Sequence, residues 1–375
     1  MSSTEMKICW ITATYFLDVD LPVVPQLKKW FDIDWTIIST PRQIATDEAY
    51  IRSQSDCSYT ILAAPARFYS PALYAFFRRL VLSIRKSRYD LYYFDISDFL
   101  FLFPLIKRYL PREKVMIATH NVNVPRGARL APLARVSMSY IIRNFRNFQT
   151  FSKNQRDALR SRKADANILY SPLMLKDYGE GSAPATPYTP PVKFLFFGNI
   201  IKYKRLDVIL QAVKILRKRG IEDFKVYICG YCDPAVWQKE YLPEIENPEL
   251  FHLDIRRIPN ELVAEYFNTC HYFLMPYQDI AQSGAMTVAL NYNMPVIASD
   301  LPTFHEFITA DHDSYFFRPA DPEALADVME RCIRNTPEQY ATLKRNLQAT
   351  VDAKLAPEAI LRNYKEFFDN FHRNA

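Results

Sequence analysis

Two segments in the second half of the chain carry residues suited to binding a phosphate group. Lys204 stands just before a predicted helix, where its ammonium can place a point charge on a phosphate. Ser283-Gly284-Ala285 opens another predicted helix, whose first backbone N–H groups have no acceptor within the helix and attract anions. Gly284 has no Cβ, so a phosphate can come close to the backbone. An exposed lysine of no special role and a plain turn are the alternatives.

Three further polar residues in the first half could bind a ligand. Asp18 and Asp20 follow an apolar run and form a candidate carboxylate pair, although a polar turn also explains them. His120 follows the apolar run that ends at Ala118, and it is either a ligand-binding residue or a hydrogen-bonded core histidine.

The elements that must position these residues alternate between strands and helices. Such alternation predicts parallel, doubly wound sheets, which bind ligands at the carboxyl ends of their strands. In the first half we expect strands over 8–13, 35–38, 91–94, 115–118 and 147–151, and helices over 22–31, 71–87 and 153–162. In the second half we expect strands over 192–197, 225–229, 272–275 and 295–298, and helices over 206–219, 261–268, 285–292, 322–335 and from 357 onward.

The length of 375 residues favours two domains, because single cores stop growing at roughly 250–300 residues. Four prolines within residues 182–191 predict an interdomain linker. We therefore expect an N-terminal domain over 1–181, a C-terminal domain over 192–356, and a terminal helix over 357–375 that packs back on the N-terminal domain.

Composition excludes several classes of protein. The chain has only seven glycines, and neither a GxGxxG fingerprint nor a Walker A loop can be written with them, which argues against NAD-type dehydrogenases and P-loop NTPases. Six scattered cysteines are typical of a reducing compartment, and the N-terminus has no apolar signal-type segment. We expect a cytoplasmic protein.

Positive charge is concentrated in the first half. Residues 1–185 carry 26 Lys and Arg against 16 Asp and Glu, and the rest of the chain carries 21 against 25. The basic half favours a polyanion, a phosphate-bearing ligand or an anionic membrane surface as partner, and we expect no nucleic acid. The predicted helix over 71–87 is either an interfacial membrane helix or a solvated face over a core stripe. Its cations, with the one that follows it, are Arg78, Arg79, Arg85, Lys86 and Arg88.

A series of short motifs in the second half, each weak alone, becomes specific in its order and spacing. They are Phe196-Phe-Gly-Asn-Ile-Ile-Lys-Tyr-Lys204, Ile258-Pro-Asn-Glu-Leu262, Phe273-Leu-Met-Pro-Tyr277, Gln282-Ser-Gly284, Met294-Pro-Val-Ile-Ala-Ser299 and Arg318-Pro-Ala-Asp-Pro-Glu-Ala-Leu325. With these motifs the region from about 194 to 332 resembles the donor domain of family 4 glycosyltransferases, which are retaining enzymes of the GT-B fold.

The resemblance implies two Rossmann-like domains that face a cleft, and transfer of a hexose from a nucleoside-diphosphate sugar to a glycan or lipid-linked hydroxyl with retention. It implies no cofactor and no metal, since Lys204 and a helix N-terminus neutralise the leaving diphosphate. The residues carried over are catalytic His120, Lys204 and Glu306; donor-binding Gly198, Asn199, Lys204, Ile258, Tyr277, Ser283, Gly284 and Ala285; and acceptor-binding Asp18, Asp20 and Asn121.

The sequence also departs from the family pattern. Ile280 and Val288 stand where most members have a pair of glutamates, and Asn199 replaces an arginine. Asp279 is a candidate substitute for the lost carboxylate. These departures leave two other functions open: a nucleotide-sugar epimerase of the GT-B fold, and a non-catalytic sugar- or nucleotide-binding module.

Overall fold

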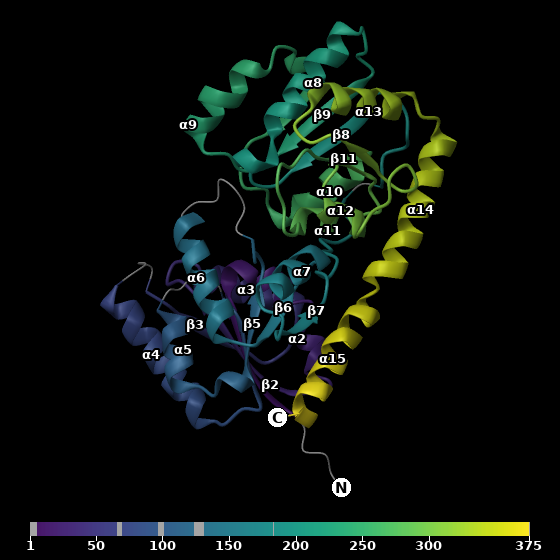
Figure 1. Ribbon diagram of the computed structural model, residues 1–375. Helices are drawn as coiled ribbons and strands as arrows, with labels where there is room; N and C mark the ends of the chain where they lie inside the picture. Colours follow the sequence, from purple (N-terminus) through teal and green to yellow (C-terminus); the bar gives the residue numbers. More distant parts are fainter. Residues whose placement is uncertain (1–5, 66–69, 97–100, 124–130, 183, 375) are drawn as a thin grey trace. The chain divides into compact units, whose positions relative to one another are not determined.

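The computed structural model describes residues 6–65, 70–96, 101–123, 131–182 and 184–374, and the chain divides into two compact units. Of the described residues, the first unit takes in those up to 123, 131–174 and 357–374, and the second takes in those of 175–356. Each unit is built on one parallel sheet with helices around it (Figure 1).

The first unit contains a seven-stranded sheet in the order β3-β2-β1-β4-β5-β6-β7. Every neighbouring pair is parallel, as a doubly wound sheet requires. The strands are β1 (Lys7–Ala13), β2 (Asp32–Ser39), β3 (Thr60–Ala63), β4 (Leu91–Asp95), β5 (Val115–Thr119), β6 (Asn147–Thr150) and β7 (Asn167–Tyr170). The helices are α1 (Leu17–Asp20), α2 (Val24–Leu27), α3 (Ile44–Gln54), α4 (Pro71–Lys86), α5 (Leu102–Tyr109), α6 (Ala131–Asn144), α7 (Lys153–Arg162) and α15 (Pro357–Asn374).

Alternation along the buried strands supplies a core on each face of this sheet. In β1, Cys9 and Ile11 belong to a cluster formed with α4, α5 and α6, whereas Ile8 and Trp10 belong to a second cluster formed with α2 and α15. Residues that alternate along a strand point to opposite faces, so both faces must be covered by helices. The C-terminal helix α15 is therefore part of the first unit's core.

The second unit contains a six-stranded parallel sheet in the order β10-β9-β8-β11-β12-β13. The strands are β8 (Val192–Phe197), β9 (Phe224–Cys229), β10 (Phe251–Asp254), β11 (Tyr272–Met275), β12 (Val296–Ser299) and β13 (Tyr315–Phe317). The helices are α8 (Leu206–Lys218), α9 (Pro234–Val236), α10 (Asn260–Thr269), α11 (Gly284–Asn291), α12 (Pro302–His305), α13 (Pro322–Arg334) and α14 (Pro337–Leu355). The two parallel sheets confirm the predicted fold class.

Some predicted elements differ from the structure. The helix expected over 22–31 is reduced to α2, which has Pro25 in its first turn and gives way to turns after Leu27. The proline-rich segment, where a linker was expected, lies within the second unit. Its Tyr188 stacks on Tyr340 of α14 at 4.2 Å between ring centroids, and the backbone N–H of Thr186 donates to Asn268. The chain passes from the first unit to the second at Met174–Leu175 instead.

The amphipathic helix α4 uses its apolar face inside the first unit. Phe77, Leu80 and Ile84 are buried in the core beside α5, and Arg78 and Arg79 are exposed. The apolar stripe is therefore occupied by the protein's own core, which agrees with the solvated-face interpretation. No helix among the described residues is long and apolar enough to cross a membrane.

Candidate active site

The loops that leave β8 and β9 touch each other through two glycines. Gly198 has a left-handed φ of +97°, and its N–H donates to the carbonyl of Cys229 at 2.9 Å. A Cβ placed on Gly230 would lie 1.9 Å from the carbonyl oxygen of Gly198, so no side chain is possible there. Both glycines stand at the carboxyl edge of the sheet, where parallel α/β sheets bind ligands.

Lys204 is a buried cation beside Gly198. It lies in a short 3-10 turn, Lys202–Lys204, and is only 9% exposed. A Cβ on Gly198 would be 3.2 Å from the Lys204 ammonium nitrogen, and that nitrogen lies 5.4 Å from the centre of the Tyr277 ring. Among the described residues no carboxylate forms an ion pair with it. Burial lowers the pKa of Lys204 to about 8, because the charged form is poorly solvated.

Tyr277 connects Lys204 to the start of α11. Its ring is buried, which raises its pKa, and the Ser283 hydroxyl lies close enough to oppose that shift. Ser283 is the N-cap of α11, and its hydroxyl accepts from the backbone N–H of Met286 at 3.2 Å. The helix begins at Gly284, so the N–H groups of Gly284 and Ala285 have no acceptor within it. The structure thus brings Gly198, Lys204, Tyr277 and the Ser283–Ala285 turn into one chain of contacts.

A second lysine lies against the start of α11. A Cβ on Gly284 would be 2.9 Å from the ammonium nitrogen of Lys176 and 3.5 Å from its Cε. The absence of a side chain at Gly284 therefore leaves space for this cation. The sequence argument missed Lys176, which is 108 positions away along the chain, and only the missing side chain at Gly284 hints at a neighbour.

Two predicted donor-binding residues, Asn199 and Ile258, have other surroundings, and Ala285 belongs to the start of α11 only through its backbone. Asn199 is exposed immediately after Gly198. Ala285 is half-buried and packs on the core of the second unit. Ile258 also packs on that core, in the loop before α10.

The positions of the family's two glutamates are filled by core residues. Ile280 and Val288 are buried in the second unit, which explains why no carboxylate occupies them. Asp279 is half-buried, and its charge adds to the effect of burial in raising the pKa of Tyr203. Glu306 follows α12 as its C-cap and is half-buried. Thr303 of the same helix donates to the carbonyl of Ile280 at 3.0 Å, which ties α12 to this loop.

In the first unit, His120 forms a buried pair with an aspartate. His120 is 4% exposed, and its Nε2 lies 2.7 Å from Oδ1 of Asp95, the last residue of β4. The imidazole is stacked between Phe16 and Phe151, with ring centroids at 3.6 and 4.4 Å. Burial, followed by the charge of Asp18, raises the pKa of Asp95 well above its usual range. The sequence argument singled out His120 but missed Asp95.

The three predicted acceptor-binding residues differ in burial. Asp20 is 1% exposed, and its Oδ2 accepts hydrogen bonds from the Trp10 indole at 2.8 Å and from the Thr12 hydroxyl at 2.5 Å. It therefore holds the core together instead of offering a carboxylate at the surface. Asp18 is half-buried, whereas Asn121 is exposed just after His120.

Comparison with known proteins supports the donor-domain resemblance. Residues 191–335 match the family model described as Glycosyl transferases group 1. The matched residues all lie within the second unit. This matched segment contains Gly198, Lys204, Tyr277 and the Ser283–Ala285 turn. No curated protein matches the chain.

Solved structures of glycosyltransferases share the fold over nearly the whole chain. Sucrose-phosphate synthase from Thermosynechococcus elongatus has a TM-score of 0.76 at 14% identity, covering 99% of this chain and all of that one. HepE from Anabaena, in complex with UDP and glucose, has a TM-score of 0.73 at 13% identity, covering 97% of this chain and all of that one. The lipopolysaccharide outer core galactosyltransferase WaaB, in its apo form, has a TM-score of 0.67 at 13% identity, covering 97% and 99%. These likenesses establish the GT-B fold.

Proposed function

We propose that the protein is a glycosyltransferase that moves a hexose from a nucleoside-diphosphate sugar to a hydroxyl of a glycan or lipid-linked acceptor, with retention and without a metal ion. The observation that carries this proposal is Lys204, a buried ammonium with no carboxylate partner among the described residues. A buried unpaired charge is costly, and an incoming anion removes that cost. The group 1 match over the same residues supports the diphosphate of a donor sugar as that anion.

The chemistry follows from the charge that the leaving group develops. The bond between the sugar's anomeric carbon and the phosphate oxygen breaks, and a bond from that carbon to the acceptor oxygen forms. The acceptor's proton passes to the departing diphosphate, so atoms and charges balance. Lys204, Lys176 and the first N–H groups of α11 stabilise the growing negative charge, which is the largest single contribution in many transfer reactions.

Lys176 compensates for part of what the chain lacks relative to its family. Asn199 supplies no cation where most members have an arginine, whereas the ammonium of Lys176 lies directly against Gly284. Two cations at one diphosphate match its two phosphates better than one cation does.

His120 is proposed to orient the donor sugar or the acceptor hydroxyl. The contact between Asp95 and Nε2 fixes the orientation of the imidazole. Asp95 then acts as a positioning residue, because it fixes the ring through a hydrogen bond and does not itself touch the substrate. Stacking between Phe16 and Phe151 limits rotation of the ring further.

A uridine nucleotide is the first donor to test, because HepE, which has the same fold, was solved with UDP and glucose. A glycan acceptor is proposed on the same basis from WaaB, a lipopolysaccharide core galactosyltransferase. The basic first half suits an acceptor that carries phosphate or sits at an anionic membrane.

The test is a binding screen followed by a transfer assay. A thermal-shift screen against UDP, GDP, TDP and ADP should show one nucleotide raising the Tm, since a ligand that binds only the native state stabilises it. The matching sugar nucleotide is then incubated with and without candidate acceptors, and the products are identified by NMR. Sugar transfer with a retained anomeric configuration supports the proposal. Epimerisation without an acceptor, or nucleotide binding with no turnover of any donor, contradicts it.

A further inference from the structure

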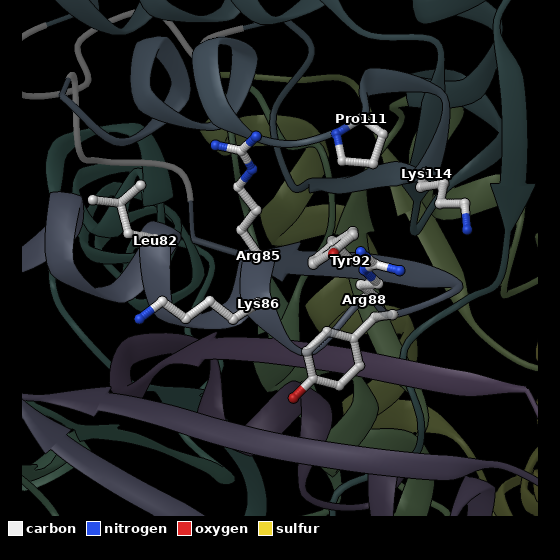
Figure 2. A pocket seen from close by; sticks show the side chains of 8 residues that line it. Leu82, Arg85, Lys86, Arg88, Tyr92, Pro111 and Lys114 are labelled. Atoms are coloured by element: carbon white, nitrogen blue, oxygen red, sulfur yellow. The ribbon is translucent and has the colours of Figure 1, made fainter.

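A basic hollow lies in the first unit, apart from the His120–Asp95 pair. Its volume is about 770 Å³, and it forms where α4 ends and where β4 and β5 begin. His120 and Asp95 stand at the carboxyl ends of those two strands, so the hollow is at the opposite edge of the sheet. Figure 2 shows Tyr92 in the middle of this hollow, with Arg85, Lys86 and Lys114 spaced around it.

Four cations line this hollow: Arg85, Lys86, Arg88 and Lys114. In the part of the chain that the structure describes, Lys114 is the one of these four that forms an ion pair, with its nitrogen 4.0 Å from Asp90. Among the described residues, the other three form no ion pair. Like charges gathered without counter-charges repel one another, so the hollow favours an anion.

Two observations argue against a merely solvated helix end. Arg85 and Lys86 belong to the last turn of α4, where cations interact favourably with the helix carbonyls. Lys114, however, comes from the separate segment that precedes β5, and Arg88 lies beyond the helix. The hollow is also lined by Tyr89 and Tyr92, whose side chains are buried in the first unit.

Arg88 occupies a backbone position that normally belongs to glycine. Its φ is +49°, in the left-handed region, and it follows Ser87, the C-cap of α4. Helices commonly end with glycine at this position, because a Cβ is strained there. Arg88, with its long cationic side chain, thus stands where the backbone favours glycine. Strained residues of this kind concentrate at ligand-binding sites.

We propose that this basic hollow, lined by Arg85, Lys86, Arg88 and Lys114, binds a phosphate-bearing ligand. Every ligand of this class would place one or two phosphate groups against the cations and its carbon skeleton beside the tyrosine rings. The source is either a soluble phosphate compound or the headgroup of an anionic lipid. The proposal is independent of sugar transfer, since none of these residues belongs to the donor site.

Arg88→Gly provides a test that separates binding from folding. Glycine relieves the left-handed backbone, so the Tm should be unchanged or raised, whereas loss of the guanidinium should weaken anion binding. Arg160→Ala is the matched control, because Arg160 is an exposed cation on α7 of the same unit. All chains carry Lys204→Met, so that the proposed donor site does not contribute to anion binding.

Two probes distinguish the sources: inorganic pyrophosphate by calorimetry, and phosphatidylcholine vesicles with and without 30% phosphatidylglycerol (roughly a physiological anionic surface) by sedimentation. Arg88→Gly should weaken at least one of them about fivefold, which corresponds to ~1 kcal/mol, and Arg160→Ala should not. Loss of pyrophosphate binding alone assigns a soluble ligand, and loss of vesicle binding assigns a lipid headgroup. Equal effects of the two substitutions, or no binding of either probe, overturn the proposal.

Discussion

Replacing Lys204 with methionine should make the free protein more stable while it abolishes donor binding. Methionine fills a similar volume without a charge, so it removes the desolvation penalty and keeps the packing against Tyr277. Most substitutions at buried sites destabilise a protein. A stabilising effect of Lys204→Met would therefore indicate a buried charge that is kept for ligand binding at a cost in stability.

The magnitude follows from the pKa of Lys204. Burial lowers it from 10.5 to about 8, which corresponds to roughly 3 kcal/mol of destabilisation at neutral pH. The unfolded chain binds the extra proton between pH 8 and 10.5, so wild-type stability rises with pH across that window. The penalty is fully present below pH 8 and disappears above 10.5. The gain in stability from Lys204→Met should therefore be largest below pH 8 and disappear above pH 10.5.

The assay is thermal unfolding at pH 7 and pH 10, with and without nucleoside diphosphate. At pH 7 the variant should melt up to roughly 10 °C above wild type, and the gap should shrink at pH 10. Nucleotide at a hundred times its Kd should stabilise wild type by about 2.7 kcal/mol and leave the variant unchanged. Lys202→Met is the control, since Lys202 is exposed in the same turn, and it should behave as wild type.

A Lys204→Met variant that is less stable than wild type at pH 7 and still binds nucleotide with wild-type affinity would contradict this prediction. Such a result would mean that the ammonium has a partner in solution and that the phosphates bind elsewhere.

Four further predictions concern the same reaction. Gly284→Val should lower nucleotide affinity at least about tenfold in calorimetry with little change in Tm, because its side chain blocks the phosphate and only displaces the flexible end of Lys176; unchanged affinity would contradict the site. Transfer should survive excess EDTA, and loss restored by Mg²⁺ or Mn²⁺ would show that a metal takes part. Donor affinity should fall as the pH rises above about 8, where free Lys204 loses its proton; a flat profile would argue against it. Asp95→Asn should reduce kcat roughly 10- to 100-fold without changing nucleotide Kd, because it loosens His120; a kcat equal to wild type would remove that role.

Strong local patterns made much of the second unit predictable. The strands β8 and β11 have the predicted bounds, because each is a short apolar run that a parallel sheet buries on both faces. The edge strand β10 was missed because His252 and Leu253 are exposed, which leaves little apolar pattern. Helix α14 was missed although a signal was present: Thr336 and Gln339 form a capping box, and Leu343 and Leu347 continue its apolar stripe.

The candidate site was predictable only where its residues lie near the motifs. Gly198, Lys204 and Gly284 could be found because each stands at the junction of a strand and a helix. Lys176 and Asp95 reach their partners through tertiary folding, and nothing in their local sequence marks them. Asp20 looked like a surface carboxylate in a polar turn, but the indole of Trp10 and the hydroxyl of Thr12 provide the hydrogen bonds that allow its burial.

The central claim is that the diphosphate of a donor binds at Lys204 and the start of α11, and a crystal structure with the nucleoside diphosphate selected by the thermal-shift screen tests it most directly. The account predicts phosphate oxygens about 3 Å from the ammonium nitrogen of Lys204 and from the backbone N–H groups of Gly284 and Ala285. A nucleotide whose phosphates bind elsewhere, beyond hydrogen-bond distance of all three groups, would contradict it.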